Sequence, residues 1–147
     1  MSYNVFHAIY EIGNALDPDH PTYHHKLLVE TKGDDKGQIH HVDGNFIQGM
    51  RYETKPGSLP KGEKKFCEPF RIGCVKQSDY QGRFEEVLKA LPPPGQQEFM
   101  NSHTKMYEQK KPDGTFYRKG ETLPPLYMCE EWTVEAIKML QDRKILT

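Results

Sequence analysis

The first half of the chain carries five runs of apolar, aromatic and β-branched residues of the kind that form strands. These runs cover residues 3–12, 23–31, 38–43, 46–54 and 66–77. Clusters rich in Gly, Pro, Asn, Asp and Lys separate them, notably at residues 14–22 and 55–65. A turn cluster at residues 32–37 joins the second run to the third. We therefore expect an antiparallel hairpin with a loop of about six residues at this point.

Two later segments repeat their apolar residues at helical spacing. Residues 83–91 place four apolar side chains on one face, and Pro92 follows, so we expect a short helix that stops sharply. Residues 130–144 form a longer helix with two adjacent apolar rows. The rows are Trp132, Ala136 and Met139, and Thr133, Ile137 and Leu140.

Residues 96–125 are the least regular part of the chain. A Lys-Pro-Asp-Gly-Thr turn at residues 111–115 predicts a small surface hairpin between residues 106–109 and 116–118. With a length of 147 residues, the chain suits one domain. We expect a single α+β domain over residues 1–147, an antiparallel sheet with a few packed helices, with 96–125 as a variable insertion.

Charge and cysteine content narrow the function classes. The net charge of −1 and the pI near 6.7 do not favour nucleic-acid binding. The short basic run at residues 61–65 indicates a solvated loop. No signal peptide and no apolar stretch of about 20 residues is visible, so we expect a cytoplasmic chain without a membrane span. Three cysteines (Cys67, Cys74 and Cys129) do not make a disulfide framework.

Cys129 stands at the predicted start of the last helix. Unpaired backbone N–H groups at a helix start favour negative charge, so a thiolate there is stabilised and nucleophilic. Glu130 and Glu131 suit a helix start but would oppose a thiolate. The alternative is a buried structural cysteine beside Trp132.

Four of the seven histidines form two doublets, His24-His25 and His40-His41, on the two strands of the predicted hairpin. Neighbouring strand residues point to opposite faces, so each doublet presents one imidazole per face. One histidine from each strand can then meet on a shared face near Cys129, which gives a nucleophile, a general base and an orienting ring.

The same residues offer a metal site as an alternative. His24, His41 and Cys129 are possible zinc ligands, but no tight ligand motif accompanies them. No phosphate loop or dinucleotide fingerprint occurs in the sequence either. We therefore expect neither a bound metal nor a cofactor.

Four short motifs resemble those of a group of small, uncharacterised fungal proteins. Residues 21–29 are similar to their Pro-x-Tyr-His-Trp-Ala-Leu-Leu-Val pattern, and residues 37–42 to a Gly-x-x-x-His-Val strand. Residues 83–88 are similar to an Arg-Leu-Glu-Glu-Ile-Leu helix, and residues 127–133 to a Trp-Asn-Cys-Gln-x-Trp-Val helix start. Those proteins resemble the permuted papain-like superfamily, which includes lecithin–retinol acyltransferase-like proteins and the PPPDE peptidases.

The resemblance implies a fold, a reaction and a set of roles. The fold would be permuted papain-like, with the base on an early strand and the nucleophile at a later helix start. His24 would be the general base, Cys129 the nucleophile and His41 the orienting group, with His40 as the alternative to His41. The reaction would be attack on an amide, ester or thioester through an acyl-enzyme, by a hydrolase or acyltransferase. Substrates would be a small molecule, a peptide or a ubiquitin-like conjugate.

A different class of function stays open beside this one. The chain can keep the fold without catalysis and act as a protein-binding module. Aromatic anchors are common at the centres of protein interfaces. The irregular segment supplies such residues, namely Phe99, Tyr107, Phe116, Tyr117 and Tyr127.

Overall fold

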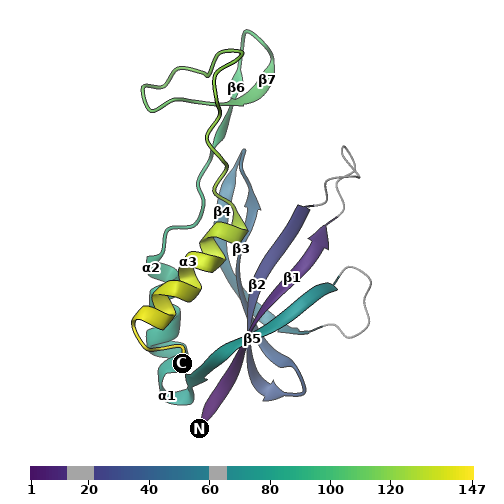
Figure 1. Ribbon diagram of the computed structural model, residues 1–147, viewed down its shortest axis with the longest axis vertical. Coiled ribbons are helices and arrows are strands. Elements are labelled where there is room, and N and C mark those ends of the chain that lie inside the picture. The colour runs from purple at the N-terminus through teal and green to yellow at the C-terminus, as the bar shows by residue number, and fades with distance from the viewer. Residues whose placement is uncertain (13–21, 60–65) are drawn as a thin grey trace.

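The computed structural model describes residues 1–12, 22–59 and 66–147, and its centre is a five-stranded antiparallel sheet (Figure 1). Its strands run in the order β4-β3-β2-β1-β5. Their bounds are Ser2–Ile12 for β1, Thr22–Gly33 for β2, Lys36–Asn45 for β3, Gly49–Ser58 for β4 and Phe66–Lys76 for β5. All five predicted strands are present, but β4 begins three residues later than predicted and continues to Ser58, so residues 55–58 of the expected loop belong to a strand. Most residues of the two expected loops, 14–22 and 55–65, lie outside the described residues.

The β2–β3 hairpin is tighter than predicted. Strand pairing continues to Gly33 and Lys36, so only Asp34 and Asp35 form the turn. Both have positive φ, at 53° and 59°. Two consecutive central residues with positive φ are typical of a type I′ turn, whose twist matches that of the two strands. Asp tolerates this conformation better than most residues.

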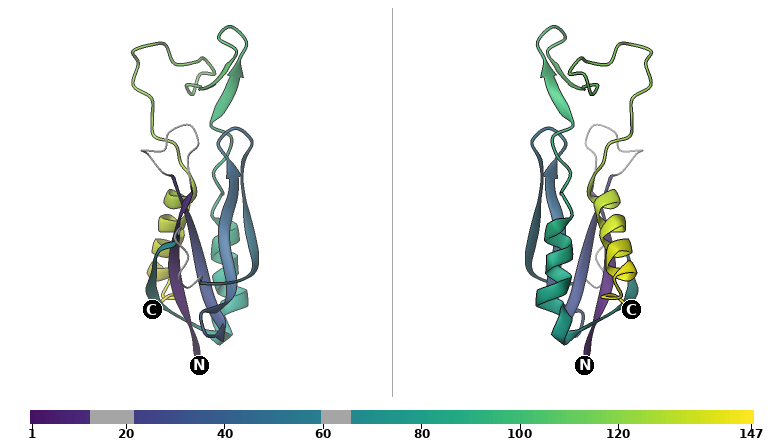
Figure 2. Two further views of the ribbon diagram at one scale, coloured as in Figure 1. Left: turned by 90° about the vertical axis from the view of Figure 1, so that its right-hand side faces the viewer. Right: turned by 90° about the vertical axis from the view of Figure 1, so that its left-hand side faces the viewer.

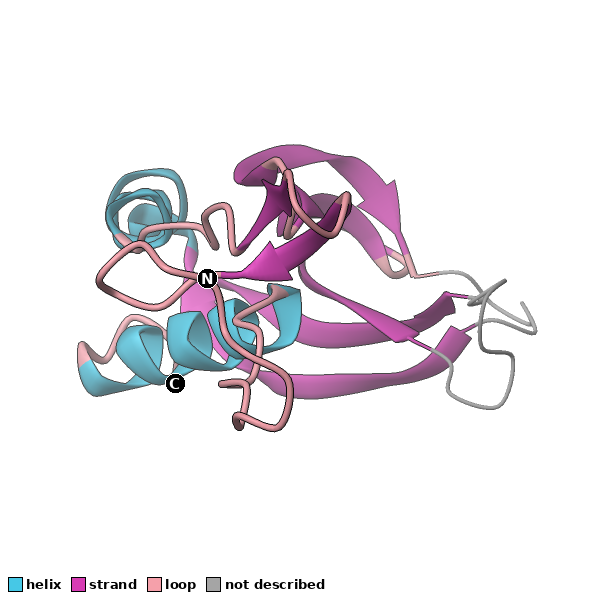
Figure 3. Cartoon of the chain, turned by 90° about the horizontal axis from the view of Figure 1, so that it is seen from above, coloured by secondary structure: helices cyan, strands magenta, loops and turns pink. Residues whose placement is uncertain are grey.

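The helices pack on one face of the curved sheet (Figure 3). The first helical segment consists of α1 (Gln77–Asp79), a π-helical turn η1 (Tyr80–Phe84) and α2 (Glu85–Ala90), so it begins six positions before the predicted start. The second is α3 (Cys129–Asp142). Its buried side chains include Trp132, Thr133, Ala136 and Leu140, largely as its two apolar rows predict.

The main core lies between these helices and the sheet. Its largest fully buried side chains are Trp132, Phe84, Leu27, Leu88, Leu140, Val5, Val29, Val42 and Val75. A smaller apolar cluster lies on the opposite face of the sheet and is formed by Ala8, Leu28, Ile39 and Leu59. The sheet therefore buries both of its faces, and the strand residues divide between them by alternation.

A separate two-stranded hairpin, here called the arm, projects beyond the end of the sheet (Figures 1 and 2). It pairs β6 (Glu98–Asn101) with β7 (Met106–Gln109). The predicted pairing of residues 106–109 with 116–118 is wrong, because only a single bridge, Lys110 to Phe116, joins these segments. The predicted turn is present, with the N–H of Lys111 donating to the carbonyl of Thr115 at 2.7 Å.

The chain thus has the mixed α+β architecture that the sequence predicts, with an antiparallel sheet and few helices. Among the described helices, none is both long and apolar enough to cross a membrane.

Candidate active site

Cys129 is the first residue of α3, and its side chain faces the sheet. Glu131 stabilises the helix start by accepting the backbone N–H of Met128 at 3.0 Å, half of a capping box. The thiol of Cys129 donates to the backbone carbonyl of Tyr23, with Sγ and O 3.7 Å apart. Only 6% of the residue is exposed. The sulfur therefore lies against the backbone of β2.

The path of β2 explains how the sulfur reaches the strand. Pairing between β2 and β3 runs from Leu27 and His40 down to the turn, and the strands have no paired residues before Leu27. In this stretch, which pairs with β1 but not with β3, the backbone N–H of His25 points at the sulfur of Cys129. The start of α3 therefore packs where β3 has separated from β2.

The resting thiol is protonated at neutral pH. Burial raises the pKa of Cys129, and the charge of Glu131 raises it further. Backbone N–H groups of His25, Glu130 and Cys129 counteract part of this rise. Burial, with a smaller contribution from the charge of Glu131, outweighs these N–H groups, contrary to the expectation of a stabilised thiolate. Any nucleophilic step at Cys129 needs a base.

The alternation of β2 decides which histidine shares the face of Cys129. Leu27 and Val29 belong to the main core under the helices, whereas Leu28 belongs to the small cluster on the other face. His25 has the parity of Leu27, and His24 that of Leu28. His25 therefore lies on the face of Cys129, and His24 lies on the opposite face.

His25 forms a pair with a histidine that the sequence interpretation did not single out. Its Nδ1 lies 2.9 Å from Nε2 of His7 on β1, and its Nε2 lies 4.0 Å from a carboxylate oxygen of Glu130. Burial lowers the pKa of His25, although Glu130 and Glu131 oppose the shift. Burial and the neighbouring His25 lower the pKa of His7 to about 4. Both rings are neutral at neutral pH, and each is able to accept a proton.

The predicted pair of His24 and His41 does form, but on the other face of the sheet. Nε2 of His24 lies 2.9 Å from Nδ1 of His41. A carboxylate oxygen of Glu53 lies 3.2 Å from Nε2 of His41, but out of line with the ring N–H, so this buried nitrogen has no hydrogen-bond partner. Burial and His41 lower the pKa of His24 to about 4.

His40, the alternative orienting group, faces the helices but has its own partners. Its Nδ1 lies 2.6 Å from the hydroxyl of Tyr52, and its Nε2 lies 2.7 Å from the hydroxyl of Tyr80. It is fully buried, and its pKa falls to about 4 through burial and the neighbouring His41. Both ring nitrogens are occupied, so His40 does not orient His25.

The structure therefore does not bring Cys129 together with His24 and His41, the set that the sequence predicts. Cys129 is where the sequence places it, but the imidazoles on its face are His25 and His7. The same division by faces excludes the zinc alternative, since His24 and His41 are separated from Cys129 by the sheet. Within the described ranges no three His, Cys, Asp or Glu side chains form a group suited to a metal.

His7 could have been found from strand register alone. It follows Val5 and Phe6 in a predicted strand, where its polarity stands out among apolar neighbours. In the structure it lies opposite Leu27, and Ile9 lies opposite His25. A diagonal across two strands brings His7 within reach of His25 on the same face.

Comparison with known proteins gives a family but no described activity. No curated protein and no solved structure matches the chain significantly. The resemblance to permuted papain-like proteins stays a prediction. One family profile matches residues 10–147, which is nearly the whole chain and includes Cys129 and His25 but not His7. The chain belongs to this family, which is described as the family of unknown function DUF6540.

Proposed function

We propose that the protein is a thiol-dependent hydrolase or acyltransferase in which Cys129 is the nucleophile and His25 the general base. The observation that carries the proposal is the contact of Cys129 with the β2 backbone at Tyr23 and His25, on the face where His7 holds the His25 ring. A nucleophile, a base and a group that orients the base then follow one another across α3, β2 and β1.

The tautomers follow from these roles. If Nε2 of His25 takes the thiol proton, it must be unprotonated at rest, so Nδ1–H donates to Nε2 of His7. The imidazolium that forms keeps this hydrogen bond. The carboxylate of Glu130, 4.0 Å from Nε2, also stabilises the positive charge. His7 is thus a positioning residue.

The reaction has two halves, each balanced in protons. The sulfur attacks the carbonyl carbon of an amide, ester or thioester, and its proton passes to Nε2 of His25. The bond to the leaving group breaks, and the leaving group takes that proton, which leaves an acyl thioester on Cys129. Water or another nucleophile then gives its proton to Nε2 of His25 and attacks the acyl carbon; the C–S bond breaks, and the sulfur of Cys129 takes that proton back.

The exposed side of the start of α3 is acidic, whereas the sulfur of Cys129 faces the sheet on the other side of the helix. A shallow hollow of about 590 Å³ follows the outer side of the first turns of α3. Its lining includes Glu130, Glu131 and Glu135, with Val134 as an apolar floor and Lys138 at its side. Such a surface favours neutral or cationic substrates over anionic ones. The proposal includes a permuted papain-like architecture, in which the base lies on an early strand, here β2, and the nucleophile at the start of a later helix, here α3.

Acylation by p-nitrophenyl acetate tests the proposal in a chain whose Cys67 and Cys74 are replaced by serine. We expect Cys129 of the folded chain to gain one acetyl group at neutral pH faster than Cys129 of the urea-unfolded chain. His25→Ala should slow acetylation by roughly a hundredfold, the lower end of general-base effects. Peptide mass spectrometry locates the acetyl group, and released nitrophenol gives the rate.

His24→Ala is the matched control, because it removes the neighbouring imidazole from the opposite face of the same strand. It should leave the acetylation rate nearly unchanged. Equal rates in the folded and unfolded chains, or equal slowing by His24→Ala and His25→Ala, would show that Cys129 and His25 do not form a catalytic pair.

The arm favours a second candidate function, that of a protein-binding module. Three of its large apolar residues are exposed, Met100 by 52%, Met106 by 65% and Tyr107 by 45%, and Leu123 in the segment that follows is exposed by 54%. Replacing Met100, Met106 and Tyr107 by serine should abolish capture of a protein partner, while Cys129→Ser should preserve it. If Cys129→Ser abolishes capture and the arm variant preserves it, binding belongs to the thiol site.

A further inference from the structure

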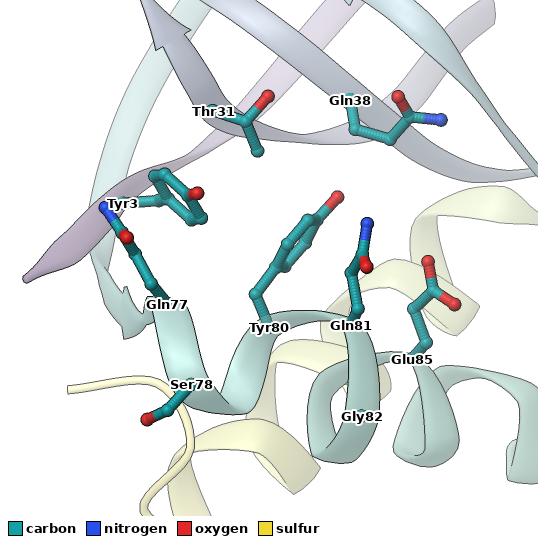
Figure 4. Close-up of a pocket in the computed structure, with 9 residues that line it drawn as sticks. All are labelled: Tyr3, Thr31, Gln38, Gln77, Ser78, Tyr80, Gln81, Gly82 and Glu85. Atoms are coloured by element: carbon teal, nitrogen blue, oxygen red, sulfur yellow. The ribbon is translucent and has the colours of Figure 1, made fainter.

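A polar cavity of about 440 Å³ lies at the end of the sheet where the β2–β3 turn meets the first helical segment (Figure 4). Its lining includes Gln38 from β3, Gln77 from α1 and Glu85 from α2. Thr31 of β2 also lines it, six positions beyond His25. At about 3.3 Å per strand residue, the cavity is roughly 20 Å from the thiol site. It is a separate site.

The π-helical turn shapes one wall of this cavity. Turns of this kind inside helices are rare and occur frequently at functional sites. The turn begins at Tyr80, which is buried, and also contains Gln81, which points toward the cavity (Figure 4). Next to Gln38, Gly37 lets β3 lie close to β2, since a β-carbon there would lie 1.9 Å from the carbonyl oxygen of Val29.

The aromatic part of the wall is held rigidly. The hydroxyl of Tyr80 binds the buried ring of His40, which in turn binds the hydroxyl of Tyr52. Tyr3 packs edge-on against Tyr80, with ring centroids 5.7 Å apart. Side chains whose rotamers are fixed by such partners cost little entropy when a ligand binds.

The amide groups of the cavity are still able to form hydrogen bonds. Across the described parts of the chain, the side chains of Gln77 and Gln81 have no hydrogen-bond partner. Gln38 uses its Nε2 on the hydroxyl of Thr54, 3.0 Å away, so its carbonyl oxygen is open. Each amide offers two donors and an acceptor. Glu85 adds acceptors, one of them near Lys89 at 3.5 Å.

Charge selects among ligands for these groups. The lining contains no Lys, Arg or His, and its one ionised side chain is that of Glu85. Phosphates and carboxylates would meet no cation in the lining itself and one carboxylate, which is paired with Lys89 outside it. Adjacent hydroxyl groups, which each donate and accept, match the mixture of amides and carboxylate. The tyrosine rings offer an apolar wall for the C–H side of such a molecule.

We propose that this cavity binds a neutral polyhydroxylated molecule, a carbohydrate or a polyol. The volume lies in the lower part of the range for ligand pockets, roughly 300–1,000 Å³, and suits one or two sugar rings. The open side formed by Gln77 and Gln81 lets such a ligand enter from solvent. This inference does not depend on the chemistry of Cys129.

The test is a titration of the full chain followed by two-dimensional amide NMR. Glucose and N-acetylglucosamine represent carbohydrates, and myo-inositol represents polyols. We expect at least one to shift the amide signals of residues 77–85, with a dissociation constant of about 1–10 mM, typical of a weak small-ligand site. If the sugars bind more tightly than myo-inositol, the ligand is a carbohydrate. If myo-inositol binds more tightly, the ligand is a polyol.

Variants sharpen the test. Gln81→Ala, at an exposed position, should weaken binding by roughly tenfold, as for one lost hydrogen bond, and Glu85→Gln by several-fold. Gln141→Ala, the same change on the exposed side of α3, should leave binding unchanged. The inference is wrong if none of the neutral probes shifts these signals, or if glucose 6-phosphate or adenosine binds more tightly than all of them. It is also wrong if Gln81→Ala does not weaken binding.

Discussion

At the scale of single residues, five histidines of the described part of the chain divide into three networks. His25 pairs with His7 near Cys129, His24 pairs with His41 on the other face, and His40 binds two tyrosines. The sequence predicts that each doublet splits between two faces, because strand alternation is obligatory. It does not tell which half faces the helices.

The reason lies in the residues that follow the first doublet. Leu27, Leu28 and Val29 are all apolar, and all three are buried because the sheet buries both faces. In a strand with one solvent-exposed face, apolar and polar residues alternate, and the apolar positions identify the buried face. Without that alternation, His24 and His25 are equivalent in sequence, and the family resemblance selected His24. Only the packing of α3 separates them.

Stability should depend on pH because one buried and two half-buried imidazoles resist protonation. The pKa values of His7, His24 and His40 lie at about 4, below the value of 6.5 in an unfolded chain. Between these limits the unfolded chain binds more protons than the folded chain. The contribution of these rings to the free energy of unfolding should therefore be complete above pH 6.5 and should decrease as the pH drops from about 6.5 toward 4.

Urea unfolding at a series of pH values measures this loss. His40 is fully buried, and its share should be on the order of 1–3 kcal/mol. His40→Gln should therefore flatten the curve, whereas His103→Gln, on the exposed arm, should not change its shape. A free energy of unfolding that stays constant down to pH 5 would contradict the buried neutral state of these rings.

At the scale of secondary-structure elements, strong local patterns predicted well and weak ones did not. The final helix was expected at residues 130–144 and is found at Cys129–Asp142, because its two apolar rows and its start signals agree. The first helical segment was expected to begin at residue 83 and begins at Gln77. Its early part, with Gln77, Ser78 and Gln81, has no apolar stripe to reveal it.

The arm shows the limit of local patterns. Strands of four residues carry little information, and residues 106–109 have two possible partners in sequence. They pair with Glu98–Asn101. The other candidate, residues 116–118, is joined to this region only by the single bridge between Lys110 and Phe116. No residue from 92 to 126 takes part in the main core. The arm therefore contributes nothing to the main core, and the interpretation of residues 96–125 as a variable insertion stays a prediction.

At the scale of the whole molecule, the ends of the described fold meet at β5. Strand β1 lies between β2 and β5, and Ser2 pairs with Lys76. The last residues then add to the outer edge of β5, where Thr147 and Cys74 exchange two backbone hydrogen bonds of 2.8 and 3.0 Å. The α+β class can be predicted from local patterns. The strand order cannot, because β1 pairs with β5, a strand more than 50 residues later in the chain.

Leu146 links this closure to the main core, so its removal should weaken the whole fold. It is 3% exposed, it bridges to Val75, and its N–H donates to the carbonyl of Leu140 at 3.1 Å. Leu146→Ala leaves a cavity between α3 and β5 and should lower the free energy of unfolding by about 2–5 kcal/mol in urea unfolding. Val134→Ala, at a position of α3 that is 53% exposed, removes apolar atoms without opening a cavity and should cost less than about 0.5 kcal/mol. Equal losses for the two variants would mean that residues 145–147 do not close the sheet in solution, and that β5 presents a free edge there instead.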